Sequence, residues 1–178
     1  MTRHLFLFAL LLASCRHWQV VRSSDSNPLA GQTRFVMLPL LWNGVRVDGD
    51  PEAKWIAGQD ADWKAEWPTD KKNAATSFVD SVAKSIGGSP RMTNAPDPSA
   101  PAITLKPSVT ELSTGGFRPT VLTLAIQVLD VNGATIEEIS TTVSVKNRYT
   151  IFESRLGDCA TEAGENIAQF IKERTAAR

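Results

Sequence analysis

The sequence predicts an α+β domain, a two-layer sandwich in which two helices cover one face of a mostly antiparallel sheet. Two observations indicate this class. Residues 120–145 alternate apolar and polar side chains around Asn132-Gly133, the pattern of a β-hairpin. Residues 70–86 and 154–175 instead repeat apolar side chains at helical spacing. With the strands described next, the expected order is β-α-β-β-β-α.

The remaining strands are expected on both sides of the first helix. Residues 33–41, TRFVMLPLL, form a short apolar run, with Pro39 at its end or on an edge because proline has no amide N–H for the ladder. Residues 102–112, AITLKPSVTEL, alternate like a strand, and Pro107 predicts an edge or a bulge. Residues 149–152 are predicted to add a further short strand.

The first helix is expected at residues 70–86, with Asp70 as its N-cap and Gly87-Gly88 at its end. The second helix, residues 154–175, carries Cys159 on its apolar face, which predicts a buried thiol. Gly157 and Gly164 either weaken this helix or let it pack closely. The apolar stripe of the first helix consists of Ala74, Ala75, Phe78, Val79, Val82 and Ile86.

The hairpin sequence also predicts a register. Asn132-Gly133 is the preferred pair for a two-residue type I′ turn, which would place Val131 opposite Ala134. A slip of one residue would turn the apolar side chains outward, so the register is well specified. The expected pairs are Val128 with Glu137, Ile126 with Ile139, Leu124 with Thr141, and Leu122 with Val143.

Four of the five tryptophans lie between the first strand and the first helix, at Trp42, Trp55, Trp63 and Trp67. If Pro51 opened a helix here, the last three would share one face with Gln59. Indole faces suit sugar rings, and neighbouring carboxylates can accept hydroxyl hydrogen bonds, so the stretch 42–67 is a candidate glycan-binding surface. The alternative is that these indoles belong to the core.

The N-terminus indicates the location of the protein. Arg3 gives a positive start, and an apolar run follows that is far shorter than the roughly 20 residues of a membrane-spanning helix, as in a signal peptide. The next residues, Leu12-Ala13-Ser14-Cys15, resemble the lipobox of bacterial lipoproteins. This resemblance implies cleavage after residue 14 and acylation of Cys15, which then becomes a lipid anchor.

The position after Cys15 refines this address. In the lipoprotein family an aspartate there favours retention at the inner membrane, and this chain has Arg16. The resemblance therefore implies an outer-membrane protein facing the periplasm. Residues 15–32 are polar and contain Pro and Gly, so they are expected to form a flexible tether that includes Trp18. Residues 33–178 are expected to form a single domain.

The expected element order, together with the lipobox, resembles the small periplasmic domains of envelope lipoproteins. These include the lipoprotein activators of penicillin-binding proteins and the curli secretion lipoprotein. The resemblance implies a protein that binds a partner during envelope assembly or transport. It transfers no binding residue to this chain, because fold-level likeness does not carry function.

Charge and cysteine content exclude several classes. The chain has 19 basic and 19 acidic residues, and Arg3 lies in the signal, so the mature chain is almost neutral. A neutral chain has no long-range attraction for nucleic acid. With Cys15 acylated, Cys159 has no cysteine to pair with. The sequence also contains no motif for a cofactor.

The residues also argue against an enzyme. Both histidines, His4 and His17, precede the expected domain, so a histidine base or ligand inside it is missing. Carboxylate pairs such as Asp48 with Asp50 or Asp60 with Asp62 could act in glycan hydrolysis, but alternate acids in a loop are more often solvated charge. A calcium site at Asp48, Asp50 and Glu52 is a weaker alternative.

Two functions from different classes remain. The first is a non-catalytic binding or scaffold module, whose strand with Pro107 could offer a sheet edge to a partner protein. The second is glycan or peptidoglycan binding through the tryptophan-rich stretch. Self-assembly by strand pairing is a third alternative.

Overall fold

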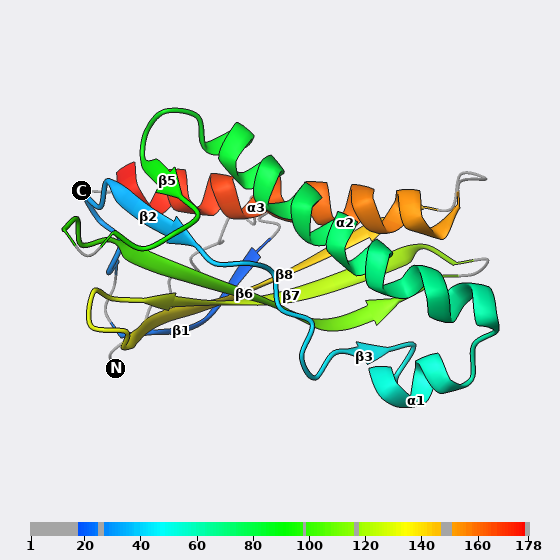
Figure 1. Cartoon of the computed structure of the whole chain (residues 1–178). Coiled ribbons are helices and arrows are strands. Elements are labelled where there is room, and N and C mark those ends of the chain that lie inside the picture. Colours follow the sequence, from blue (N-terminus) through cyan, green and yellow to red (C-terminus); the bar gives the residue numbers. More distant parts are fainter. Residues whose placement is uncertain (1–17, 25–26, 98, 116–117, 147–150, 177–178) are drawn as a thin grey trace, which may run out of the picture.

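The computed structural model describes residues 18–24, 27–97, 99–115, 118–146 and 151–176. It contains a mixed sheet of eight strands and three helices (Figure 1). The α+β class predicted from the sequence is thus confirmed. The strands are β1 (Trp18–Ser23), β2 (Arg34–Met37), β3 (Arg46–Val47), β4 (Asp50–Pro51), β5 (Arg91–Thr93), β6 (Ile103–Ser113), β7 (Thr120–Leu129) and β8 (Thr135–Val145), and the helices are α1 (Glu52–Ala57), α2 (Ala61–Ile86) and α3 (Phe152–Ala176).

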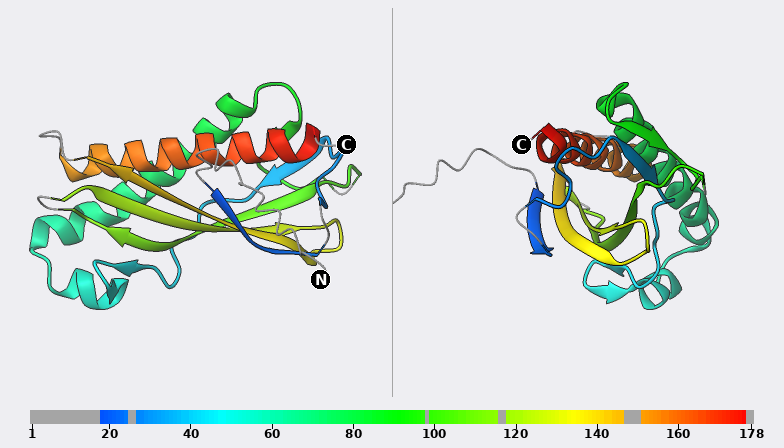
Figure 2. Two further views of the ribbon diagram at one scale, coloured as in Figure 1. Left: turned by 180° about the vertical axis from the view of Figure 1, so that it is seen from behind. Right: turned by 90° about the vertical axis from the view of Figure 1, so that its left-hand side faces the viewer.

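The expectation of a mostly antiparallel sheet was wrong, because the sheet is mixed. Its main order is β1-β8-β7-β6-β2-β5. β1, β8, β7 and β6 pair antiparallel, whereas β2 runs parallel to both β5 and β6, and β3 runs parallel to β6. The chain leaves β2, passes through α2 and returns beside it, and such a crossover brings strands together in parallel. In Figures 1 and 2, α2 and α3 lie side by side on the same side of the sheet.

The predicted tether is partly folded, which corrects the boundary at residue 33. Trp18–Ser23 forms the edge strand β1 and pairs antiparallel with β8. Trp18 is only 9% exposed, and its ring meets Phe170 of α3 edge-on at 6.0 Å between centroids. Leu29 is also fully buried. The strand was missed because five of its six residues are exposed, so it has no apolar alternation to detect.

The hairpin register is confirmed for all four predicted pairs, from Val128 with Glu137 to Leu122 with Val143. The turn differs from the prediction. Asp130 N donates to Ala134 O at 2.8 Å, which leaves a three-residue loop with Gly133 at φ +81°. The Asp130 carboxylate accepts from the amides of Asn132 and Ala134. A register shift between Val128 and Leu129 absorbs the extra residue.

Helix α2 starts nine positions before the predicted boundary, at Ala61. Asp60 is the N-cap, and its carboxylate accepts from Trp63 N at 2.9 Å. Pro68 lies inside the helix, where it removes one backbone hydrogen bond. Burial of Trp67 and Asp70 on either side of Pro68 shows that tertiary packing overrides the local signal for a break.

Pro107 lies in an interior strand, not at the predicted edge. β6 is flanked by β7 and β2. Leu41 N donates to Pro107 O at 3.0 Å, so the side of Pro107 that lacks an N–H faces residues 38–41, beyond the end of β2. The bulge in β6 lies later, between Val109 and Glu111. Proline is tolerated because regular pairing with β2 ends at Met37 and Leu105, before it reaches Pro107.

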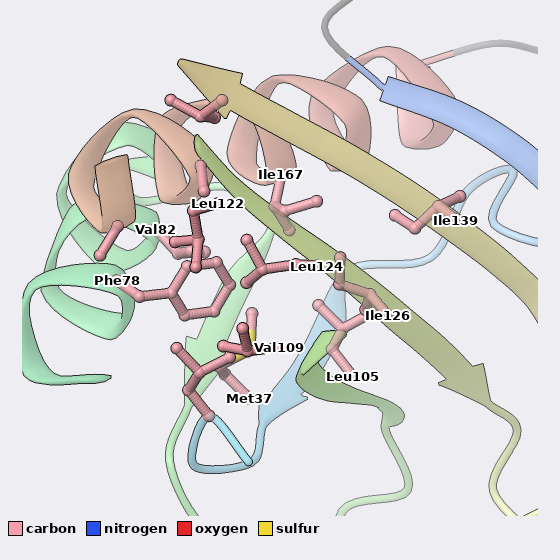
Figure 3. Close-up of a cluster of buried hydrophobic side chains, with 14 of the residues drawn as sticks. Met37, Phe78, Val82, Leu105, Val109, Leu122, Leu124, Ile126, Ile139 and Ile167 are labelled. Carbon is pink, nitrogen blue, oxygen red and sulfur yellow. The ribbon is translucent and has the colours of Figure 1, made fainter. Parts of the chain in front are cut away.

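The core lies between the sheet and the two long helices. Figure 3 shows Phe78 and Val82 of α2 and Ile167 of α3 packed among side chains of the sheet. The predicted close approach at Gly164 is confirmed, because a Cβ there would lie 2.6 Å from Phe78 O. The labelled sheet residues of this cluster are Met37, Leu105, Val109, Leu122, Leu124, Ile126 and Ile139.

Two further expectations concern the ends of the fold. Most of the strand predicted at residues 149–152 lies outside the described residues, and Phe152 is the first residue of α3 rather than part of a strand. The lipobox and Cys15 also lie outside the described residues. Within the described part of the chain, no helix is long and apolar enough to cross a membrane.

Candidate binding site

The tryptophan-rich stretch folds into one aromatic cluster. Trp55 meets Trp63 edge-on at 5.5 Å between ring centroids and lies 5.2 Å from Trp67. Trp67 in turn meets Trp42 at 5.8 Å. Phe152, at the start of α3, completes the cluster at 5.1 Å from Trp63. All four predicted tryptophans are therefore brought together, with one phenylalanine from the far end of the sequence.

The last three tryptophans do not come together on one face of a single helix, as the sequence predicts, because two helices carry them. α1 ends at Ala57, Gly58 follows, and Asp60 begins the cap of a separate helix. The chain folds back so that the short helix α1 places Trp55 against the first turns of α2. The four-residue spacing was therefore a correct signal for proximity but not for a continuous helix.

Burial divides the four tryptophans into two classes. Trp42 is 8% exposed and Trp67 is 2% exposed, so neither indole face is open to a sugar. Trp55 and Trp63 are half-buried. Of the four indoles, only those of Trp55 and Trp63 are therefore open to a ligand that stacks on them.

One oxygen of the Glu52 carboxylate contacts two side chains at this cluster. Trp67 Nε1 donates to Glu52 Oε1 at 2.7 Å, and Lys71 forms an ion pair with the same oxygen. The Lys71 ammonium also lies 5.5 Å from the Trp67 ring centroid, within cation–π range. The charge of Glu52 is thus balanced by Lys71 within the protein.

A hollow opens beside the aromatic cluster, between α2 and the start of α3. Its volume is about 590 Å³. Three carboxylates and no basic side chain are among its described lining residues. We call it the acidic hollow. Its lining consists of Trp63, Ala65, Glu66, Thr69, Asp70, Ile151, Phe152 and Glu153.

Asp70 is the most buried of the three acids, at 7% exposed. Burial raises the pKa of its carboxyl group above the ordinary value of 3.8, and the nearby charges of Glu153 and Glu66 raise it further. Among the described residues, no side chain or amide donates a hydrogen bond to the Asp70 carboxylate. The predicted capping role of Asp70 was wrong, because it lies in the third turn of α2 and Asp60 is the cap.

The other predicted carboxylates are occupied separately. Asp48 accepts from the amide and the hydroxyl of Thr114 at 2.9 and 2.6 Å. Asp50 pairs with Lys54 at 2.7 Å, and Asp60 caps α2. The calcium alternative at Asp48, Asp50 and Glu52 therefore fails, since each carboxylate points to a different partner. In the described ranges, no group of three His, Cys, Asp or Glu side chains could hold a metal ion.

Cys159 is the buried thiol that the sequence predicts. It is fully buried on α3, and burial raises the pKa of its thiol to about 11. Its sulfur lies 3.6 Å from Thr120 O as a weak donor. A thiol with such a high pKa is a poor nucleophile at neutral pH.

Reasoning from the sequence missed the acidic hollow. Its two sides come from α2 and from α3, and only the fold brings Glu66 and Asp70 near Glu153. One signal was present: Glu66 and Asp70 are like charges at i and i+4, a destabilising pair on a helix. Such a pair indicates a surface whose charge serves something other than helix stability.

Comparison with known proteins assigns no family. No protein-family model matches the sequence, and no curated protein matches it. Among solved structures, the PelC dodecamer from Paraburkholderia phytofirmans is similar with a TM-score of 0.47 and 15% identity, over 84% of this chain and 96% of that chain. Protein XCC0632 from Xanthomonas campestris, described with family model DUF330, has a TM-score of 0.47 and 11% identity, over 86% of this chain and 92% of that chain. Both likenesses are too remote to assign the chain to a family.

Proposed function

We propose that this chain is a membrane-anchored periplasmic lipoprotein that acts as a non-catalytic binding or scaffold module in envelope assembly or transport. The observation that carries the proposal is the position of Cys15. The lipobox ends there, and the sheet begins at Trp18. Three residues span at most about 10 Å, so an acylated Cys15 would hold β1 close to the bilayer surface.

The fold supports a domain that is held at one edge and free elsewhere. We infer a two-layer arrangement in which α2 and α3 cover one face of the sheet (Figure 2). The edge strand β1, with Val21 61% exposed, would face the membrane. The acidic hollow lies at the opposite end of α3 from Phe170, which contacts β1. This leaves the hollow accessible to a periplasmic partner.

The non-catalytic role is supported by the residues in the candidate site. His4 and His17 precede β1 in the sequence, and Cys159 is buried with a raised pKa. A neutral chain also favours a protein or glycan partner over nucleic acid. We therefore expect binding without turnover.

Glycan binding remains the second candidate, favoured by the half-buried Trp63 next to carboxylates. Burial of Trp42 and Trp67 restricts this candidate to Trp55 and Trp63. It predicts that N-acetylglucosamine oligomers change the tryptophan fluorescence, and that Trp63→Ala removes the change.

The test of the anchor compares wild type with Cys15→Ser in a two-membrane bacterium. We expect the parent protein to be processed and to fractionate with membranes, and the variant to remain unprocessed. Cys159→Ala is the matched control and should fractionate as the parent does. If Cys15→Ser is processed and fractionates like the parent, the proposed anchor is wrong.

The same cells test the location and the partner. Separation of the two membranes should place the parent in the outer membrane, and Arg16→Asp should move it toward the inner membrane. Crosslinking in intact cells should capture an envelope protein with the parent chain. Recovery of the chain with itself alone would instead favour self-assembly.

A further inference from the structure

We propose that the acidic hollow binds the ammonium or guanidinium group of a lysine or arginine that a partner protein presents. The inference rests on the proposed binding function and names the chemistry of the partner. It depends on the hollow alone and not on the lipid anchor. Three features of the hollow support it: its unbalanced charge, the low exposure of Asp70, and its aromatic wall.

The described lining of the acidic hollow carries negative charge without a cation to balance it. Glu66, Asp70 and Glu153 line the same hollow, and its described lining has no basic side chain. Glu153 accepts one hydrogen bond, from Asn73 Nδ2 at 3.1 Å, and this donor is neutral. Lys71, which follows Asp70 in α2, is paired with Glu52 instead.

Asp70 combines low exposure with the absence of a hydrogen-bond donor among the described residues. The residue is only 7% exposed, yet none of the described residues donates to its carboxylate. Two other shielded carboxylates each pair with a cation through one of their oxygens. Glu137, which is fully buried, forms an ion pair with Arg174, and the half-buried Glu52 has both Trp67 and Lys71. A buried carboxylate without a donor is costly, and an incoming cation removes that cost.

One wall of the hollow is aromatic. Trp63 and Phe152 line the hollow together, with their ring centroids 5.1 Å apart. Lysine and arginine carry apolar stems that pack on such rings, and their charged ends are attracted to ring faces. A bare metal ion would gain nothing from this wall. A neutral sugar could donate hydroxyl hydrogen bonds to the three carboxylates but would leave their charge uncompensated.

The hollow also has room for a side chain delivered from outside. Its volume of about 590 Å³ exceeds that of one lysine or arginine side chain, so part of the partner backbone fits as well. Ile151, at the rim, is 70% exposed and offers an apolar contact to that backbone. The features together describe a site for a basic side chain on a partly apolar segment.

The test measures binding of fluorescein-labelled peptides to the full-length chain in non-ionic detergent. The peptides alternate glycine with lysine, with arginine or with glutamate. Fluorescence anisotropy is read at about 0.15 M salt, where the Debye length is about 8 Å and long-range attraction is screened. We expect the lysine or arginine peptide to bind and the glutamate peptide not to bind.

Matched variants decide whether the hollow is the site. Asp70→Asn removes one charge inside it and should weaken binding about tenfold or more, the order expected for a hydrogen bond to a charged group. Asp80→Asn removes one charge from an exposed position of the same helix and should change affinity less than about twofold. Glu66→Gln combined with Glu153→Gln should also weaken binding, with Trp63→Ala giving a smaller loss.

Three results would overturn the inference. One is an equal effect of Asp70→Asn and Asp80→Asn, which means non-specific charge attraction. Another is absence of binding by both basic peptides, which leaves the Cys15→Ser fractionation result untouched. The third is binding of neutral N-acetylglucosamine oligomers in preference to the peptides, which would favour glycan binding as the function of the hollow.

Discussion

Two buried carboxylates show how this protein treats the same charge in different ways. Burial raises the pKa of Glu137, and the Arg174 guanidinium and a hydrogen bond from Ser23 offset only part of this shift. Glu137 lies on the apolar face of the hairpin, where it ties β8 to the last turns of α3. Asp70 has no ion-pair partner among the described residues, so nothing offsets the cost of its burial, whereas Arg174 offsets part of that cost for Glu137.

Asp70→Asn should therefore stabilise the protein at neutral pH. The pKa of Asp70 is raised in the folded state, so the unfolded chain releases this proton first as pH rises. Stability falls as pH rises from the ordinary pKa of 3.8 up to the folded value and is then constant. Below that range both states are protonated and no penalty exists. Thermal melting should thus show a higher Tm for Asp70→Asn at pH 7, with the advantage lost below about pH 4.

Asp80→Asn serves as the control for this prediction, since Asp80 is exposed on the same helix. Its Tm should follow the wild type across the same pH range. A lower Tm for Asp70→Asn at pH 7 would mean that the Asp70 charge has a stabilising partner.

The residue scale also explains what could be predicted about the candidate site. The tryptophan cluster was detectable because large aromatic residues recur at four-residue spacing from Trp55 to Trp67. The hollow beside it was not, because Phe152 and Glu153 come from the opposite end of the chain. Whether an indole is core or surface depends on which distant residues cover it. That is why Trp67 and Trp63, on one helix, have different exposure.

At the scale of elements, the contact between α2 and α3 depends on a glycine. Gly164 brings α3 against α2, and a Cβ there would lie 2.6 Å from Phe78 O and 2.9 Å from Ser81 Cβ. Ser81 Oγ donates to Thr161 O at 2.7 Å across the same contact. The two helices therefore meet backbone to backbone at this point.

Gly164→Ala should destabilise the protein by about 1–2 kcal/mol, because an added methyl forces the helices apart. The matched change Gly157→Ala is on the same helix, where a Cβ meets nothing within 4 Å. It should stabilise by up to about 1 kcal/mol through helix propensity. Urea unfolding of both variants measures the difference, and equal effects of the two changes would contradict the packing argument.

Elements differed in how far local sequence determined them. The hairpin register could be predicted because β7 alternates buried and half-buried positions along its whole length. β1 could not be predicted, because Trp18 is its only buried residue. The strand forms by pairing with β8, which is more than 100 residues away in the sequence. β5 was not among the strands expected from the sequence, and it is a strand only because β2 lies beside it.

At the scale of the whole molecule, the two ends of α3 contact two different features, the edge strand β1 and the acidic hollow. Phe170 near its C-terminus packs on Trp18 of β1, and Phe152 at its N-terminus lines the acidic hollow. Eighteen residues of helix at 1.5 Å each place these contacts about 27 Å apart. Figure 1 shows α3 running along the length of the molecule. A chain anchored through Cys15 would thus hold the hollow away from the anchored edge.

A pair of fluorophore labels tests this geometry. Val21 and Ile151 are exposed at 61% and 70%, and each can be changed to cysteine for labelling, since Cys159 is buried. In the lipidated chain on vesicles of phosphatidylethanolamine and phosphatidylglycerol, a headgroup quencher should quench the label at residue 21 at least about threefold more than that at residue 151. Equal quenching at both positions would contradict an orientation with β1 at the bilayer.

The sequence by itself determined the features that depend on near neighbours along the chain. These are the lipobox expectation at Cys15, the α+β class, the hairpin register and the buried face of α3 with Cys159. Tertiary structure alone decided the mixed sheet, the place of β1 and the acidic hollow around Asp70. Each of these is made by residues distant in sequence, and the periodicity of one segment carries no information about which other segment will cover it.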